Sequence, residues 1–268
     1  MTAHDTHAHG HRESAAQSHQ WRTAADSAAY LVPLLDAGAR VLDIGSGPGT
    51  ITIDLARLVA PGSVIGVDVS TEAVEEALGL AVDNGIGNVS FTVGDAHALD
   101  FASDTFDVVH AHQMLHHVAD PVAVLREARR VLKPGGIFAA RDMDFGGAIW
   151  APAAPALTQW LSVFQDSLRA HGGEPHAGRS LKHWALEAGF HDVVATASVS
   201  CFSSDADREW WAGFRAEEVV ASNFASRAIE TGHVQLADLH AMERAWHEWG
   251  AAEDGWFVMP HGEIIARA

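Results

Sequence analysis

The chain of 268 residues is 48% hydrophobic and 19% charged, proportions that are typical of a folded protein and exclude a wholly disordered one. Its formal net charge is −18, and only two of its 17 basic residues are lysines. A nucleic-acid partner needs a basic surface that neutralises phosphates, so we expect none. The single cysteine, Cys201, excludes an intrachain disulfide and a metal site built from cysteines alone.

No apolar stretch approaches the roughly 20 residues that cross a bilayer, and no basic segment followed by an apolar one begins the chain. We therefore expect a cytoplasmic protein without membrane insertion, and the sequence leaves a homodimer open. Residues 1–18 hold scattered histidines and little that can pack, which favours a mobile tail over a metal site. No metal site is expected elsewhere, and residues 19–268 are predicted to form a single domain.

Helix-length and strand-length segments alternate after this tail. A helical pattern of small and apolar residues begins near Ser18 and continues to Leu35. The strands and intervening helices are then predicted, in chain order, at 40–44, 50–59, 63–68, 71–84, 89–93, 106–110, 121–132 and 137–141. Five strands separated by helical or irregular segments predict a parallel sheet with both faces covered, which is a doubly wound α/β core.

The alternation changes after residue 145. The remaining elements are predicted as helices at 155–170 and 180–188, a strand at 192–202, mainly helix over 205–251, and a closing strand or hairpin from 256–259 and 263–266. Two inserted regions, about 150–172 and 204–252, are expected to form a lid of helices. Their tryptophans either line an acceptor pocket or form the lid's own core, and the core is the favoured interpretation for most of them.

A glycine cluster, residues 45–49, ends the first strand and leads into a helix. Glycines allow the backbone to approach a ligand closely, and the N–H groups of the helix start point toward it. The dinucleotide fingerprint would place its third glycine at position 50, where this chain has Thr50. Asp68 ends the second strand, where a carboxylate accepts hydrogen bonds from both ribose hydroxyls. Together these features predict an adenosine-type ligand.

The segment Val41-Leu-Asp-Ile-Gly-Ser-Gly-Pro-Gly-Thr50 resembles motif I of class I S-adenosylmethionine-dependent methyltransferases. Further stretches agree in order and spacing: residues 66–68 (GVD), 94–96 (GDA), 106–109 (FDVV) and 132–136 (LKPGG). The match covers residues 18–145 and is most similar to the ubiquinone/menaquinone-biosynthesis methyltransferase group.

This resemblance implies a Rossmann-like, seven-stranded sheet, mostly parallel with an antiparallel last strand, and helical lid insertions. It also implies S-adenosylmethionine as cofactor and methyl transfer to a small molecule of secondary or cofactor metabolism. The acceptor atom, oxygen, nitrogen, sulfur or carbon, stays open.

Site roles follow from the same resemblance. Gly45, Ser46 and Gly47 are expected at the amino-acid end of the cofactor, and Asp68 at the ribose. Asp95 would accept from the adenine amino group, while the N–H of Ala96 donates to the ring. Asp43 would either help to hold the sulfonium or ammonium group or fix the geometry of the loop. Further contacts are expected from Val69 and Leu99, which sandwich the adenine or belong to the core, and from Trp21, Tyr30, His112 and Gln113.

The acceptor is expected beyond the carboxyl ends of the fourth and fifth strands. His112 or His116 is a candidate base for proton removal, although paired histidines are common here in the resembling group whether or not either acts. Asp142 and Asp144 follow the fifth strand and either orient an amine, bind a cation or, the favoured interpretation, remain solvated loop carboxylates. His261 is a further candidate for the pocket.

The sequence also bears on two other functions. A short-chain dehydrogenase needs a Tyr-x-x-x-Lys pair, but the only tyrosine, Tyr30, is followed four residues later by Leu34, so this class is nearly excluded. A methyltransferase-fold protein that binds S-adenosylmethionine but catalyses a cyclisation or isomerisation stays open, because a fold does not fix the chemistry.

Overall fold

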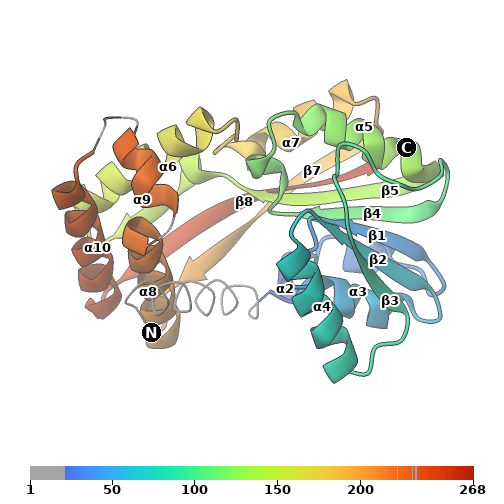
Figure 1. Cartoon of the computed structure of the whole chain (residues 1–268), viewed down its shortest axis with the longest axis horizontal. Coiled ribbons are helices and arrows are strands. Elements are labelled where there is room, and N and C mark those ends of the chain that lie inside the picture. Colours follow the sequence, from blue (N-terminus) through green and yellow to red (C-terminus); the bar gives the residue numbers. More distant parts are fainter. Residues whose placement is uncertain (1–21, 222, 231, 233) are drawn as a thin grey trace. The chain divides into compact units, whose positions relative to one another are not determined.

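The computed structural model describes residues 22–221, 223–230, 232 and 234–268 (Figure 1). This part of the chain divides into two compact units. We call them the core unit, residues 22–143, 176–198 and 261–268, and the helical unit, the described residues of 144–175 and 199–260. The predicted tail, residues 1–18, and the predicted cofactor contact Trp21 lie outside the described residues. Among the helices described, none is long and apolar enough to cross a bilayer.

A mostly parallel sheet organises the core unit. The parallel strands are β1 (Arg40–Ile44), β2 (Ser63–Asp68), β3 (Val89–Val93), β4 (Phe106–His112) and β5 (Leu132–Met143). They lie in the order β3-β2-β1-β4-β5, and β8 (Trp256–Arg267) pairs antiparallel with β5. β7 (His191–Phe202) pairs with β8. The strand order reverses between β1 and β4, and ligands bind such sheets at the carboxyl ends of the strands at this point. The predicted fold class is confirmed.

Helices cover both faces of this sheet (Figure 1). Leu42 and Phe138 face one layer of helices, whereas their neighbours Val41 and Ala139 face the other, because successive strand residues point to opposite faces. Both layers are buried, as is usual for parallel strands. The first layer contains α5 (Pro121–Val131) and α7 (Ala177–Glu187), and the second contains α2 (Ala24–Ser27), α3 (Thr50–Val59) and α4 (Thr71–Asp83).

The helical unit has an aromatic core. Trp160 and Trp246 are completely buried, with ring centroids 4.8 Å apart. The guanidinium group of Arg215 lies 4.2 Å from the ring centroid of Trp211 and pairs with Glu218 at 2.6 Å. These tryptophans belong to the core, as expected for most of them. The unit consists of η3 (Phe145–Gly147), β6 (Ile149–Ala151), α6 (Pro155–Ala170), α8 (Asp205–Ala221), α9 (Asn223–Glu230) and α10 (Leu236–Ala251), with β6 pairing antiparallel to the start of β8.

Two elements differ from the sequence-based expectations, and a third resolves an alternative that the sequence left open. The helix predicted from Ser18 to Leu35 is, where described, only the four-residue α2, followed by the 3-10 turn η1 (Val32–Leu34). Pro33 lies in that turn, and proline has no N–H with which to continue an α-helix. Of the two alternatives for the closing segment, a strand or a hairpin, the structure has one continuous strand, β8. β6 adds an eighth strand to the seven that were predicted.

Gly262 on β8 marks a close approach of two backbones. A Cβ atom at this position would lie 1.9 Å from the carbonyl oxygen of Gly178, near the start of α7. We expect Gly262→Ala to lower the free energy of unfolding by about 2 kcal/mol, because one backbone must shift to admit the methyl group. As a control, Gly79→Ala in α4 meets open space and should raise stability by about 0.8 kcal/mol. Urea unfolding measures both changes, and equal effects would contradict the packing argument.

Candidate active site

The glycine loop lies at the carboxyl end of β1, at the switch point of the sheet. Gly45 has φ +70°, Gly47 +52° and Gly49 +83°, which are left-handed conformations that favour glycine. A Cβ atom at Gly45 would lie 2.6 Å from Cβ of Met114, so the loop also packs closely against the segment after β4. Gly49 is the N-cap of α3, and the helix therefore starts at the loop. This is the arrangement that the sequence predicted for ligand binding.

Asp68 ties the loop to the end of β2. Its Oδ2 accepts from the N–H of Gly47 at 2.8 Å, and its Oδ1 accepts from the N–H of Ser70 at 2.9 Å. A carboxylate oxygen accepts more than one hydrogen bond, so both oxygens retain capacity for ribose hydroxyls. The hydroxyl of Ser46 is buried beside them without a partner among the described residues. An unsatisfied buried hydroxyl at the glycine loop fits a ligand that supplies the missing hydrogen bond.

Asp43 is completely engaged in the sheet. Thr52 on α3 donates to its Oδ2 at 2.6 Å, and Nδ1 of His110 on β4 lies 2.7 Å from its Oδ1. All three side chains are buried. The carboxylate therefore connects β1, α3 and β4, an arrangement that fits the interpretation in which Asp43 fixes loop geometry. Sequence reasoning did not single out His110, although it stands two residues before His112 on the same strand and so shares its face.

His112 is buried, and neither of its ring nitrogens has a partner among the described residues. Burial lowers the pKa of this imidazole well below its usual value, and the nearby positive charges of Arg22 and Arg141 lower it further. His112 is therefore neutral at pH 7. Because an unpaired buried imidazole is costly, its position at the end of β4 fits a site that a ligand completes.

A second group of buried polar side chains surrounds His112. The hydroxyl of Tyr30 is buried without a described partner, and its pKa is raised well above its usual value by burial and then by the charge of Glu263. Arg141 donates from Nε to the hydroxyl of Ser198 at 3.1 Å, and the same nitrogen lies 3.4 Å from Oε1 of Glu263. The sequence predicted Tyr30 here but missed Arg141 and Glu263, which the β5–β8 pairing places side by side.

Gln113 connects this group to β8. It has a φ of +50°, which is unusual for a residue other than glycine, and its backbone N–H donates to the carbonyl of Arg141 at 2.8 Å. Its side-chain nitrogen donates to Nε2 of His261 at 2.9 Å. Two residues singled out separately in the sequence, Gln113 and His261, are therefore in contact.

His116 and Asp142 form a buried pair. Nδ1 of His116 lies 2.6 Å from Oδ1 of Asp142, and the backbone N–H of His116 donates to Oδ2 at 3.1 Å. Burial alone would raise the pKa of Asp142, but the charge and hydrogen bond of His116 and the N–H of Met143 lower it, and the net shift is downward. Asp144 belongs to the helical unit, where it accepts from the N–H of Gly146 at the start of η3. The sequence marked His116 and Asp142 as candidates but did not pair them.

The residues expected at the adenine differ in exposure. Leu99 and Ala96 are buried in the core cluster beneath α5, whereas Val69 is 73% exposed. Asp95 is also largely exposed, with its carboxylate turned to its own loop, where it accepts from His97. The adenine roles of Val69, Asp95 and Ala96 stay predictions.

The comparisons with known proteins agree with this geometry. A family model described as a methyltransferase domain matches residues 35–184. An uncharacterized methyltransferase of Schizosaccharomyces pombe is 34% identical over 258 residues, which cover 93% of this chain and 92% of that protein. The chain belongs to the methyltransferase domain family. It is an S-adenosylmethionine-dependent methyltransferase, and the resemblance found in its motifs is confirmed.

Two further similarities bear on the chemistry. The ubiquinone/menaquinone biosynthesis C-methyltransferase of Hahella chejuensis is 40% identical over 102 residues, 37% of this chain and 41% of that enzyme. The crystal structure of the 4+2 cyclase SpnF is similar with a TM-score of 0.54 and 25% identity, covering 88% of this chain and 79% of that chain. The unsatisfied polar atoms of Ser46 and His112 and the glycine loop fit the cofactor, S-adenosylmethionine.

The buried, neutral His112 makes stability depend on pH. Below a pH of about 6.5 the unfolded chain binds a proton at His112, while the folded chain, whose pKa there is well below that value, does not. Folding therefore becomes less favourable as the pH falls. His112→Gln should reduce the loss of stability between pH 7.5 and pH 5.5 by about 1.4 kcal/mol. Urea unfolding at both pH values measures this, and an unchanged loss would show that His112 titrates alike in both states.

Proposed function

We propose that the enzyme transfers a methyl group from S-adenosylmethionine to a small-molecule acceptor, with His116 as the base. The observation that carries this proposal is the buried pair in which Asp142 holds Nδ1 of His116 at 2.6 Å. The pair lies where the chain leaves β4 and where β5 ends, at the carboxyl edge that binds substrates in such sheets. A nucleic-acid acceptor is disfavoured by the net charge of −18.

The pairing defines the chemistry of His116. Because a carboxylate accepts hydrogen bonds, Nδ1 of the neutral ring carries the proton, and Nε2 is the basic nitrogen. Bound S-adenosylmethionine supplies an electrophilic methyl group. As the acceptor atom forms its bond to that methyl group, Nε2 of His116 takes the proton that the acceptor loses, and Asp142 stabilises the resulting imidazolium. The bond between the methyl group and sulfur would break with its electron pair left on sulfur, so that S-adenosylhomocysteine would leave as a neutral thioether.

The neutral state of His112 supports the same function. The cofactor carries a positive sulfonium, and a second positive charge beside it would oppose binding. Burial and two neighbouring arginines keep His112 uncharged, while Glu263 balances Arg141. A buried neutral imidazole still supplies a donor and an acceptor, so we place His112 at the amino-acid end of the cofactor together with Gln113.

A second candidate function is cyclisation or isomerisation without methyl transfer. The similarity to the cyclase SpnF over 88% of this chain favours keeping it. In that case the site would bind S-adenosylmethionine without passing on its methyl group.

Incubation with methyl-labelled S-adenosylmethionine and a panel of thiols, phenols, amines and quinols separates the two candidates. We expect label transfer to at least one acceptor class and formation of S-adenosylhomocysteine in equal amount. Tight binding of the cofactor with no transfer to any acceptor would favour the second candidate.

His116→Gln should lower kcat by about a hundredfold, because a positioned base contributes roughly that much to proton transfer. Asp142→Asn should lower kcat by a similar factor, since the amide has one acceptor oxygen where Asp142 uses two and lacks the negative charge that stabilises the imidazolium. The affinity for S-adenosylhomocysteine should change less than about threefold in either variant, and thermal melting checks that each one folds.

His183→Gln is the matched control, because His183 lies on α7 with its side chain 77% exposed and should leave kcat unchanged. Full activity of folded His116→Gln would exclude His116 as the base.

A further inference from the structure

The segment between β3 and β4, residues 94–105, carries Asp95 and Ala96, the two residues that are expected to form hydrogen bonds with the adenine, yet it contains neither helix nor strand. We call it the adenine loop. Its few internal backbone hydrogen bonds include those from the N–H of Ala98 to the carbonyl of Asp95 and from the N–H of Phe101 to the carbonyl of Leu99. Backbone hydrogen bonds also fix its two ends, from the N–H of Gly94 to the carbonyl of Asp68 and from the N–H of Asp104 to the carbonyl of Arg130. The middle of the loop needs other groups to hold it.

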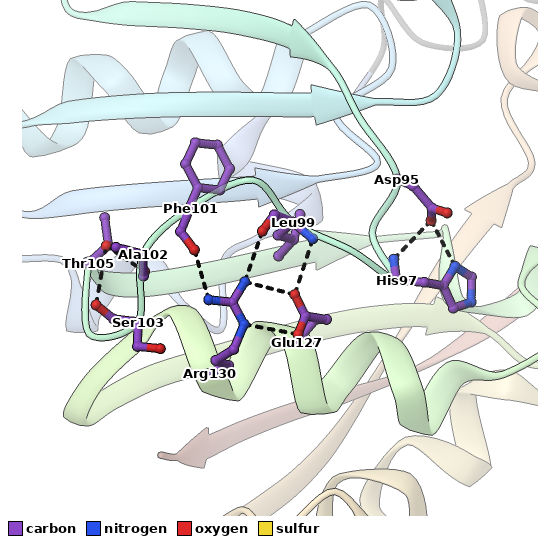
Figure 2. Close-up of polar contacts among 9 residues, drawn as sticks. All are labelled: Asp95, His97, Leu99, Phe101, Ala102, Ser103, Thr105, Glu127 and Arg130. Carbon is purple, nitrogen blue, oxygen red and sulfur yellow. Dashed lines mark hydrogen bonds and ion pairs between the residues drawn. The ribbon is translucent and has the colours of Figure 1, made fainter.

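A pair of charged residues on α5, Glu127 and Arg130, holds the middle of the adenine loop (Figure 2). Arg130 donates from Nη1 to the carbonyl of Phe101 at 2.7 Å and from Nη2 to the carbonyl of Leu99 at 2.8 Å. Glu127 accepts from the N–H of Leu99 at 3.1 Å and pairs with Arg130 through two hydrogen bonds of 2.9 and 2.8 Å. The planar guanidinium thus holds two loop carbonyls and one carboxylate in a fixed geometry.

His97 acts on the near end of the loop (Figure 2). Its backbone N–H donates to Oδ1 of Asp95 at 2.9 Å, and its ring Nδ1 lies 2.8 Å from the same oxygen. Both contacts are on one oxygen, so Oδ2 of Asp95 makes no hydrogen bond within the described part of the chain. The side chain of Asp95 is 63% exposed and would otherwise rotate freely. Its pKa is lowered by the N–H and then by the ring of His97, so the carboxylate stays ionised at neutral pH.

We propose that His97 is a positioning residue that directs Oδ2 of Asp95 to the 6-amino group of the cofactor's adenine. Glu127 and Arg130 fix the position of the adenine loop relative to α5. This inference rests on the proposed function, in which Asp95 contacts the adenine. A carboxylate oxygen accepts from an amino group but repels a carbonyl oxygen at the same place, so an oriented Asp95 selects a 6-amino purine over a 6-oxo purine. His97 thereby sets the preference of the site for adenine.

The test is a comparison of S-adenosylhomocysteine with its 6-oxo analogue, S-inosylhomocysteine, by calorimetric titration of the full chain. Wild-type protein should bind the 6-amino ligand at least about tenfold more tightly. In His97→Ala this ratio should fall to about threefold or less, since Asp95 loses one of the two contacts that orient it. His97→Asn should restore most of the ratio, because the asparagine Nδ2 donates from nearly the position of the histidine Nδ1.

Arg130→Gln tests the contacts that hold the middle of the loop. It should lower both the affinity for S-adenosylhomocysteine and the ratio of the affinities for the 6-amino and 6-oxo ligands. Arg57→Gln is its control: this surface arginine on α3 pairs with Asp54 and Asn84, outside the adenine loop, and its loss should change neither quantity.

If His97 had only a structural role, His97→Ala would bind both ligands more weakly by the same factor. An unchanged ratio of the two affinities in this variant would therefore overturn the inference. A wild-type protein that binds both ligands equally would overturn it too, while leaving the proposed function intact. Failure of wild-type protein to bind S-adenosylhomocysteine at all would overturn the proposed function and this inference together.

Discussion

The geometry of the glycine loop, which we expect to bind the cofactor, depends on the buried carboxylate of Asp43. One oxygen accepts from Thr52 on α3 and the other from His110 on β4, so a single side chain sets the spacing of β1, the following helix and the neighbouring strand. The glycine loop begins immediately after β1, and its left-handed residues can present their N–H groups correctly only if both ends are fixed. Asp68 then ties the middle of the loop to β2.

Charge pairing is the common feature of the other buried titratable residues near the carboxyl ends of the strands. Arg141 lies beside Glu263, His116 beside Asp142, and His110 beside Asp43, so most buried titratable groups have a partner of opposite or compensating character. Among the described residues, His112 and the hydroxyl of Tyr30 lack such a partner, and His112 avoids the cost of a buried charge by remaining neutral. Pairing and burial thus limit the positive charge that Arg141 and His112 carry into this group of side chains.

The features that could be predicted from the sequence are those formed by residues close together along the chain. The motif spacing, the glycine loop and Asp68 follow one another along the chain, and both the fold class and the family were predicted correctly from them. The paired contacts were not. Asp43 and His110 are 67 residues apart, and their contact depends on a strand register that no local pattern specifies. The short α2 was missed for a different reason: the helical periodicity continued through Pro33, where the chemistry of proline prevails over the pattern.

Strand β8 belongs to both units of the chain, and this has a consequence for the inserted helices. Its residues 256–260 belong to the helical unit and residues 261–267 to the core unit, so the second inserted segment, residues 199–260, ends within one uninterrupted strand. The entropic cost of closing a chain segment grows slowly with its length, about 0.6 kcal/mol for each doubling. A change in the length of the inserted helices should therefore cost little loop-closure free energy and leave the strands that carry the glycine loop unchanged.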